Sequence, residues 1–399
     1  MSKNTNVTPD GTRDLLFEEC EARLSVEQTL KRVFKGRGFT EVITPSIEFM
    51  DIFSQNGNQL PIKQMYKFSD SKGRMVVMRP DSTVPIARLT ATRLKSHVLP
   101  IRLYYNQAVY CQNRLLSGRS DEIVQAGIEI IGSESKKADL EVISTAVEAL
   151  HTLKTEDFRL EIGHIGIFNT LMRVLDINDE LAEQIRRLIE LKNYPALNDL
   201  LDNLDDDKSS ILKQLPRLFG GEEVFEKANM LFKNEEIKNI LDYLKDIYTS
   251  LSALGLNGKI TLDLGMVQRA EYYTGVVFRG YIEGFGEEVL SGGRYDRLLS
   301  GFGRQLAATG FGINVDAIAN ALLKAKEDAF KINPPAVLIH ALDGYEMKAF
   351  IYSREFGKNG TVCENSLFET KEQAAEYAKL KGIKQLHVIS ETTEIIDIL

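Results

Sequence analysis

The chain has 399 residues, of which 43% are hydrophobic and 27% charged, and its formal net charge at pH 7 is -8. This length and composition are typical of a soluble globular protein with at least two domains, and the acidic balance argues against a grip on a nucleic-acid backbone over the whole surface. No apolar run approaches the ~20 residues that cross a bilayer, and the first residues lack the blocks of a signal peptide, so we expect a cytoplasmic protein.

The first third of the chain alternates helix and strand patterns. Apolar residues at near-helical spacing predict a helix from Asp14 to Lys35, with Asp14 as its cap and Gly36 and Gly38 as its stop. FTEVITP predicts a short strand closed by Pro45, and MYKFSD and RMVVMRP, on either side of the turn SKG, predict a hairpin. Further strands are expected at IRLYYNQAVYC, IVQAGIEIIG and FRLEIG, with helices at ADLEVISTAVEALHTL and GHIGIFNTLMRVL.

A different pattern covers residues from about 176 to 256. Leucine, isoleucine and charged residues dominate there and strand patterns disappear, which predicts an all-helical insertion. Its acidic run from Asp205 to Asp207 is interpreted as a solvated loop. Strand patterns return at KITLDLGMV, YYTGVVFRGYI and EEVLSGGRY, and FGINVDAIANALLKA predicts a closing helix. Together these elements predict an α+β fold in which helices flank an antiparallel sheet.

The end of the chain predicts a second, smaller domain. After KINPPA, the strands AVLIHAL, TVCE and QLHVIS alternate with the helices YEMKAFIYSREFG and KEQAAEYAKLKG, which is typical of a small α/β unit. We place the boundary near Asn333, so that residues 1–332 form the core domain and residues 333–399 the C-terminal domain.

Neither the cysteines nor the histidines are spaced as metal ligands. Cys20, Cys111 and Cys363 are far apart without a C-x-x-C pair, and the five histidines are equally scattered. We therefore expect reduced thiols, no metal site and no cofactor.

Four segments carry a resemblance to a known family. They are GTRD at 11–14, RPDSTVPIAR at 79–88, GRSDEIVQAGIEIIG at 118–132, and EYYTGVVF with GGRYDRL between 271 and 298. Each alone is weak evidence, but in this order they resemble the catalytic core of histidyl-tRNA synthetase, a class II aminoacyl-tRNA synthetase. The resemblance covers roughly the first 325 residues and implies the class II fold.

The resemblance also implies a pocket for free histidine. By position, its residues are Asp81, Thr83, Gln125, Glu129, Tyr272 and Tyr273. The chemistry fits, because an ammonium group needs acceptors such as Asp81 and Gln125, and an imidazole needs partners such as Glu129 and a tyrosine hydroxyl. Taken singly, the two tyrosines also fit core packing and Glu129 a surface position on an alternating strand.

The chain departs from the synthetases where ATP chemistry requires arginine. The arginine after the aromatic residue of motif two is replaced by Cys111, and the arginine ending motif three by Ala317. A third arginine, before the tyrosine pair, is matched by Gln268, although a one-residue slip would place Arg269 there. Adenylate formation needs cations on the α-phosphate, and each lost charge-assisted contact removes ~1.5–3 kcal/mol, so we expect no catalytic residues.

A pocket kept while the arginines are lost resembles the regulatory subunit of ATP phosphoribosyltransferase, a synthetase-like family with a trimmed C-terminal domain. That resemblance implies a non-catalytic protein needed for the first step of histidine biosynthesis. It also implies histidine as effector, a short-form ATP phosphoribosyltransferase catalytic subunit as partner, and a self-dimer within a hetero-oligomer.

Two alternatives stay open at this point. One is a divergent histidine-activating ligase or histidyl-tRNA synthetase that uses other cations, such as Arg114, Arg119 or Arg269. The other is an RNA-binding adaptor, for which a basic helix face would be drawn from Lys371, Lys379, Lys381 and Lys384. The acidic composition and the short C-terminal domain argue against contact with tRNA.

Overall fold

A computed structural model describes residues 6–54, 62–113, 118–153, 155, 157–256, 258–267 and 272–398. The chain divides into two compact units, Met1–Glu327 and Asp328–Leu399. The short helix η5 (Glu327–Phe330) spans this division, and the boundary expected near Asn333 falls a few residues beyond it.

A nine-stranded sheet forms the centre of the first unit, in the order β1-β5-β6-β12-β11-β10-β7-β9-β8. All pairings from β5 through to β7 are antiparallel, but β1 pairs with β5, and β7 with β9, in parallel. The sheet is therefore mixed, because the long insertion between β7 and β9 is a crossover that lets the chain re-enter in the same direction. The strands are β1 (Thr40–Glu41), β5 (Ile101–Tyr110), β6 (Glu122–Ile131), β7 (Phe158–His164), β8 (Phe219–Gly220), β9 (Ile260–Asp263), β10 (Val276–Ile282), β11 (Leu290–Arg294) and β12 (Ala308–Asn314).

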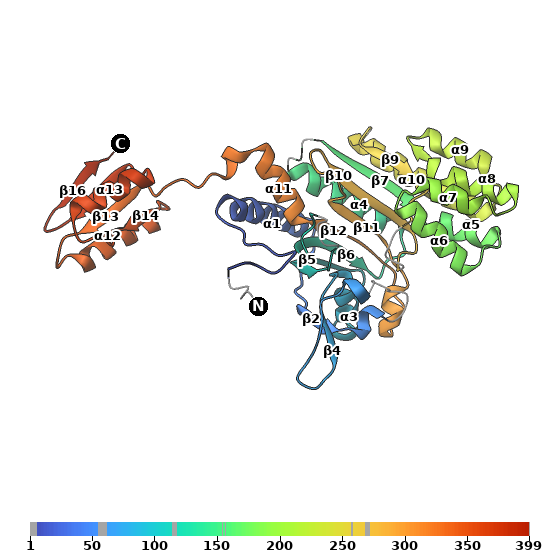
Figure 1. The fold of residues 1–399 in the computed structure, drawn as a ribbon, viewed down its shortest axis with the longest axis horizontal. Coiled ribbons are helices and arrows are strands. Elements are labelled where there is room, and N and C mark those ends of the chain that lie inside the picture. Colours follow the sequence, from blue (N-terminus) through green and yellow to red (C-terminus); the bar gives the residue numbers. More distant parts are fainter. Residues whose placement is uncertain are drawn as a thin grey trace. The chain divides into compact units, whose positions relative to one another are not determined.

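Helices α1 (Glu18–Gly36), α4 (Lys136–Thr152) and α11 (Val315–Ala325) cover one face of this sheet (Figure 1). The expected N-cap at Asp14 is wrong, because α1 begins at Glu18, after Phe17 has turned the chain with φ 48°. The expected stop is confirmed: Gly36 ends the helix and Gly38 follows with φ 80°. These three helices do not cover the opposite face of the sheet.

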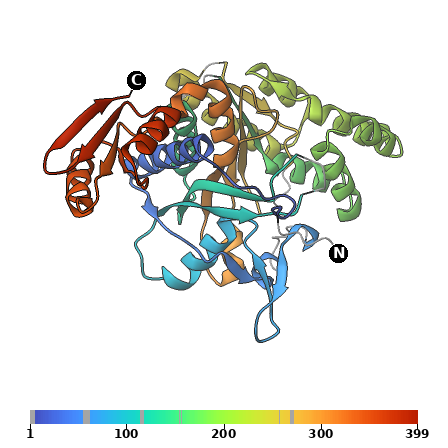
Figure 2. The ribbon, with the colours of Figure 1, turned by 60° about the vertical axis from the view of Figure 1, so that its left-hand side comes forward.

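The insertion gathers at the end of the sheet formed by β7 and β9 (Figure 2). Its helices are α6 (Asp179–Glu190), α7 (Tyr194–Leu201), α8 (Asp206–Gln214), η2 (Leu215–Arg217), α9 (Glu223–Leu231), α10 (Glu235–Leu251) and η3 (Ser252–Leu256). It is not all-helical, because β8 adds a two-residue strand to the sheet edge beside β9. The acidic run is exposed as expected, but Asp206 and Asp207 form the first turn of α8 rather than a loop. Carboxylates are favourable at that end of a helix.

A second, three-stranded sheet stands beside β5 and β6 and is ordered β2-β4-β3. The hairpin predicted across the turn SKG is confirmed as β3 (Lys67–Ser69) and β4 (Met75–Met78), whereas FTEVITP supplies only β1 before β2 (Ile47–Phe49). Short helices accompany these strands: α2 (Asp51–Ser54), η1 (Ile62–Gln64), α3 (Thr83–Arg93) and η4 (Leu298–Phe302). Helix α5 (Ile165–Val174) instead follows β7 and contacts α10. Within the described ranges, no helix is long and apolar enough to cross a membrane.

The second unit is a four-stranded sheet in the order β14-β13-β15-β16. Its elements are β13 (Val337–Ala341), α12 (Glu346–Lys358), β14 (Cys363–Asn365), α13 (Lys371–Lys381), β15 (Gln385–Ile389) and β16 (Thr393–Asp397). The sequence pattern missed β16, which pairs antiparallel with β15. Of the lysines considered for a basic face, Lys371 pairs with Glu394 and Lys381 with Glu364, which weakens that face as an RNA contact.

A buried ion pair ties the insertion to the sheet. Arg294, on β11, contacts both carboxylate oxygens of Asp139, on α4, at 3.0 and 3.1 Å, and Tyr243 of α10 donates to the same carboxylate. The Arg294 and Asp139 side chains are only 8% and 1% exposed.

We expect Asp139→Asn to lower the free energy of unfolding by about 3 kcal/mol, because it leaves a buried guanidinium with one carboxylate partner fewer. Urea unfolding measures the change. The control is Asp246→Asn, which breaks the Lys136–Asp246 pair where the aspartate is 63% exposed, and should cost no more than about 1 kcal/mol. Equal losses in the two variants would contradict the role assigned to Asp139.

Candidate functional site

Glycines hollow out the sheet face that the three helices leave uncovered. In the ladder, Gly310 of β12 stands opposite Glu129 of β6, and Gly312 stands opposite Gly127. A Cβ at Gly310 would lie 1.8 Å from Glu129 Oε2, and one at Gly312 would lie 2.6 Å from Gln125 Nε2. Because neither position carries a side chain, the long polar side chains of β6 have room to lie over β12.

Glu129 lies at the centre of this hollow and is only 1% exposed. Its Oε1 accepts a hydrogen bond from Thr83 Oγ1 at 2.9 Å, and its Oε2 accepts one from the hydroxyl of Tyr295. Burial raises the pKa of Glu129 to about 8, against the opposing effect of the two hydroxyl donors. A buried carboxyl of this kind holds a proton that a cationic or N–H-bearing ligand can replace.

Asp81 supplies a second carboxylate from the turn between β4 and α3. Its Oδ1 accepts from the backbone N–H of Val84 at 2.8 Å, and its Oδ2 accepts from the Tyr272 hydroxyl at 3.3 Å. Burial raises the pKa of Asp81 to about 6, although these donors oppose the shift. Asp81 thus ionises more readily than Glu129 and is the better acceptor for a ligand ammonium at neutral pH.

Three aromatic rings close the hollow. The rings of Tyr272 and Tyr273 have centroids 4.8 Å apart, and those of Tyr272 and Tyr295 are 5.8 Å apart. Tyr273 lies against Gly293 of β11, where a Cβ would meet its ring at 2.8 Å. The tyrosines therefore give the site an apolar wall with polar tips, which suits a flat heteroaromatic ligand.

Gln125 is an unsatisfied acceptor on the same strand face as Glu129. Its Oε1 is buried and, within the described residues, has no hydrogen-bond partner. A buried amide oxygen without a donor costs free energy, so a ligand that brings an N–H to it would be favoured.

Direct contacts join five of the six residues expected to form the pocket in pairs: Thr83 with Glu129, Asp81 with Tyr272, and Tyr272 with Tyr273. The sixth, Gln125, lies on the same face of β6 as Glu129. The structure adds Tyr295 and Tyr105, which the sequence reasoning missed. Tyr105 stands opposite Gly127 in the ladder, and burial beside Glu129 raises its pKa well above 10. Alternation along the strands could have indicated both tyrosines, because residues two apart point to the same face of a sheet. Tyr295 lies two residues after Gly293, and Tyr105 lies two residues before Gln107.

Neutral residues occupy the two positions where the synthetases carry ATP-binding arginines and this chain does not. Cys111 directly follows β5, with its Sγ 3.5 Å from the Pro80 carbonyl oxygen, and Ala317 is buried in the first turn of α11. Arg119 pairs with Glu287 at 2.9 Å on the surface. Arg114, Gln268 and Arg269 lie outside the described residues. Within the described ranges, no group of three or more His, Cys, Asp or Glu residues is placed to hold a metal ion.

Comparison with known proteins shows the family to which this chain belongs. The family model for histidyl-tRNA synthetase matches residues 11–318. The ATP phosphoribosyltransferase regulatory subunit of Clostridium botulinum is 40% identical over 379 residues, which cover 94% of this chain and 90% of that protein. This chain belongs to the ATP phosphoribosyltransferase regulatory subunit family. A second member, from Bacillus mycoides, is 39% identical over 391 residues, covering 96% of this chain and 91% of the relative.

Solved structures agree with the family. A crystal structure from Bacillus halodurans, described as an ATP phosphoribosyltransferase regulatory subunit/histidyl-tRNA synthetase, superposes with a TM-score of 0.82 at 31% identity. It covers 94% of this chain, and 96% of that chain is matched. The histidyl-tRNA synthetase of Nostoc shares the fold, with a TM-score of 0.77 at 20% identity over 99% of this chain and 97% of its own. The predicted α+β, synthetase-like architecture is thereby confirmed.

Proposed function

We propose that this chain is the non-catalytic regulatory subunit of ATP phosphoribosyltransferase, acting in the cytoplasm in the first step of histidine biosynthesis and in its feedback control by histidine. The observation that carries the proposal is a buried cluster of two carboxylates and an unsatisfied amide oxygen in a member of the regulatory subunit family. Cys111 and Ala317 support a role without ATP chemistry, because neither can stabilise charge on a phosphate.

The pocket suggests how histidine would lie. Its ammonium would meet Asp81 and the free Gln125 oxygen, and an imidazole N–H would meet Glu129, which Thr83 and Tyr295 hold in place. The rings of Tyr272 and Tyr273 would flank the imidazole. Binding would couple to control if histidine favours one arrangement of the complex over another, since a ligand shifts an equilibrium only by its difference in affinity for the two states.

Co-purification with a short-form ATP phosphoribosyltransferase catalytic subunit tests the proposal. We expect the catalytic subunit to gain activity on mixing, and histidine to inhibit the mixture. Because coupling between sites is reciprocal, the substrates of the catalytic subunit should change histidine affinity by the same factor in calorimetry. Absence of histidine binding to both the free chain and the complex would refute the sensor role.

Pyrophosphate exchange with ATP and histidine separates this proposal from a divergent ligase. We expect no exchange above the background without protein, because the described residues at the two key positions are a thiol and a methyl group. Exchange that depends on the chain would instead assign it histidine-activating chemistry.

A further inference from the structure

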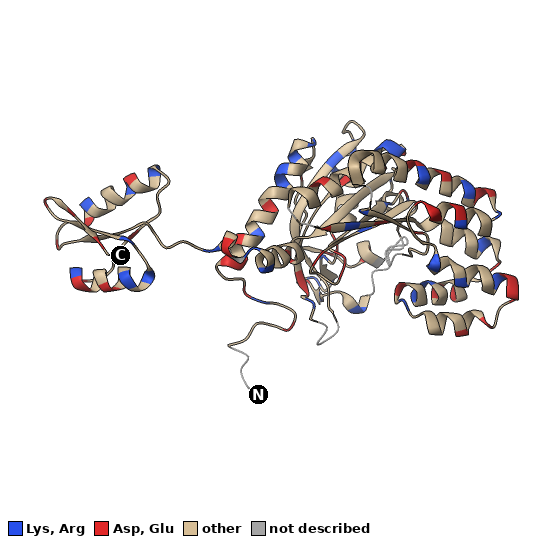
Figure 3. Cartoon of the chain, turned by 90° about the horizontal axis from the view of Figure 1, so that it is seen from above, with Lys and Arg blue, Asp and Glu red and all other residues tan. Residues whose placement is uncertain are grey.

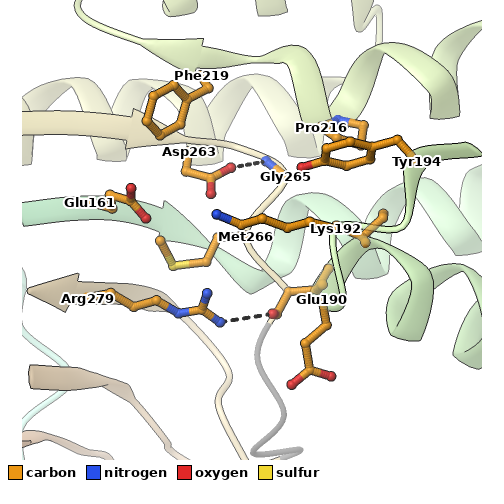
Figure 4. A pocket seen from close by; sticks show the side chains of 12 residues that line it. Glu161, Glu190, Lys192, Tyr194, Pro216, Phe219, Asp263, Gly265, Met266 and Arg279 are labelled. Atoms are coloured by element: carbon orange, nitrogen blue, oxygen red, sulfur yellow. Dashed lines mark hydrogen bonds between the residues drawn. The ribbon is translucent and has the colours of Figure 1, made fainter. Parts of the chain in front are cut away.

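A second hollow lies where the insertion meets the edge of the sheet (Figure 4). Its volume is about 290 Å³, near the lower end for small-molecule sites. Glu161 of β7, Asp263 of β9 and Arg279 of β10 line one side, and Lys192, Tyr194 and Phe219 of the insertion line the other. Four strand spacings separate β7 from β6, or about 19 Å, so this hollow is distinct from the one around Glu129.

The sheet side of the second hollow carries an excess of negative charge. Arg279 is already engaged, because its Nε lies 3.2 Å from Glu288 Oε2 and its Nη2 donates to the Val267 carbonyl oxygen at 3.3 Å. Asp263 has one oxygen bonded to the Gly265 N–H at 3.0 Å. Burial and the nearby charge of Glu161 raise the pKa of Asp263 to about 6, against the opposing charges of Arg279 and Lys192.

The ammonium of Lys192 shows where a cation can lie in this hollow. Figure 4 shows its side chain extended across the space, with the ammonium directed between Glu161 and Asp263. Within the described residues it forms no ion pair closer than 4 Å. Its backbone has φ 53°, an uncommon conformation for a non-glycine residue, directly after α6 ends. Lys192 is exposed, so its long side chain can leave the hollow without disturbing the core.

We propose that this hollow binds a small organic cation, with a primary ammonium group on a short apolar body. The ammonium would take the place that the Lys192 ammonium approaches in the free protein, between Glu161 and Asp263. Tyr194, Phe219 and Met266 would contact the apolar body, and the tyrosine ring can also face the charge. The volume limits the ligand to about the size of an amino acid. Because the site lies apart from the Glu129 pocket, it does not depend on the proposed histidine sensing.

The test uses the full chain without histidine, which carries a primary ammonium of its own, and 1,5-diaminopentane as the probe in calorimetry at pH 8 and low salt. We expect one diamine per chain with a dissociation constant below about 1 mM, and no heat from the neutral analogue 1,5-pentanediol. Asp263→Asn should weaken binding at least about tenfold by removing a carboxylate.

Lys192→Met gives the sharper result, because it removes the competing ammonium from an exposed position that the fold does not need. We expect the diamine to bind this variant about threefold to tenfold more tightly than the parent chain. The control Asp246→Asn, which neutralises an exposed carboxylate on α10, should leave binding unchanged. The proposal is wrong if Lys192→Met leaves diamine affinity unchanged or weakens it, or if the diol binds as well as the diamine.

Discussion

Replacing Glu129 with glutamine is expected to weaken histidine binding about 100-fold, because the carboxylate proposed to accept from the imidazole N–H becomes a neutral amide with a weaker acceptor oxygen. The change keeps the volume of a side chain that is only 1% exposed and leaves Thr83 and Tyr295 with a polar partner. Calorimetric titration with histidine measures the loss. Glu122→Gln, on the exposed end of the same strand, is the control and should bind as the parent does. An unchanged affinity in Glu129→Gln would remove Glu129 from the site.

The same substitution should make the free protein more stable at alkaline pH. The folded-state pKa of Glu129, about 8, lies above its ordinary value of 4.5. Between these values the folded chain keeps a proton that the unfolded chain has released, so stability falls as pH rises through this window and stays low above it. Glutamine removes this dependence. The stability difference between variant and parent should therefore grow by about 3 kcal/mol from pH 5 to pH 8, as urea unfolding would show.

A substitution that weakens ligand binding but stabilises the free protein indicates a binding residue, whereas a substitution at a packing residue is expected to lower stability. A carboxyl buried only for packing would have been replaced without loss by an apolar side chain, since burying a charge is costly. Here a carboxyl group is kept at position 129, although burial and the nearby charge of Asp81 raise its pKa. The fold thus holds an unfavourable group in place, as binding sites often do.

Local patterns in the sequence were sufficient for most elements of the fold. The hairpin β3–β4 follows from alternating residues around a glycine turn, and the end of α1 follows from Gly36 and Gly38. The start of α1 did not, because Asp14 satisfies a capping pattern while Phe17, with no such signal, makes the turn that begins the helix. Whether the helix begins after Asp14 or after Phe17 depends on packing against distant residues, and a short stretch of sequence does not contain that information.

Pairing between strands far apart in the sequence explains the features that local patterns did not predict. The parallel pairing of β7 with β9 joins residues separated by the whole insertion, and the two-residue β8 is too short to leave a periodic pattern. Tyr295 reaches Glu129 only because β11 and β12 place Gly293 and Gly310 side by side between them. The resemblance to a family named six pocket residues, but contacts between strands were needed to find this seventh.

Gly310→Ala is expected to remove histidine binding and to lower the free energy of unfolding by about 3 kcal/mol. The added Cβ would lie 1.8 Å from Glu129 Oε2, which can rotate away only by leaving Thr83 and Tyr295. It would also lie 2.4 Å from the Ile128 carbonyl oxygen, which is part of the β6–β12 ladder and cannot move without separating the strands. Calorimetry and urea unfolding measure the two losses.

Gly286→Ala is the matched control for that substitution, because no atom lies within 4 Å of a Cβ there and its φ is not positive. It should change neither histidine affinity nor stability by more than about 0.5 kcal/mol. If Gly310→Ala bound histidine as the parent does, the ligand could not lie where Glu129 and Gly310 meet. The carboxylates of Asp81 and Glu129 would then be buried for some purpose other than binding histidine.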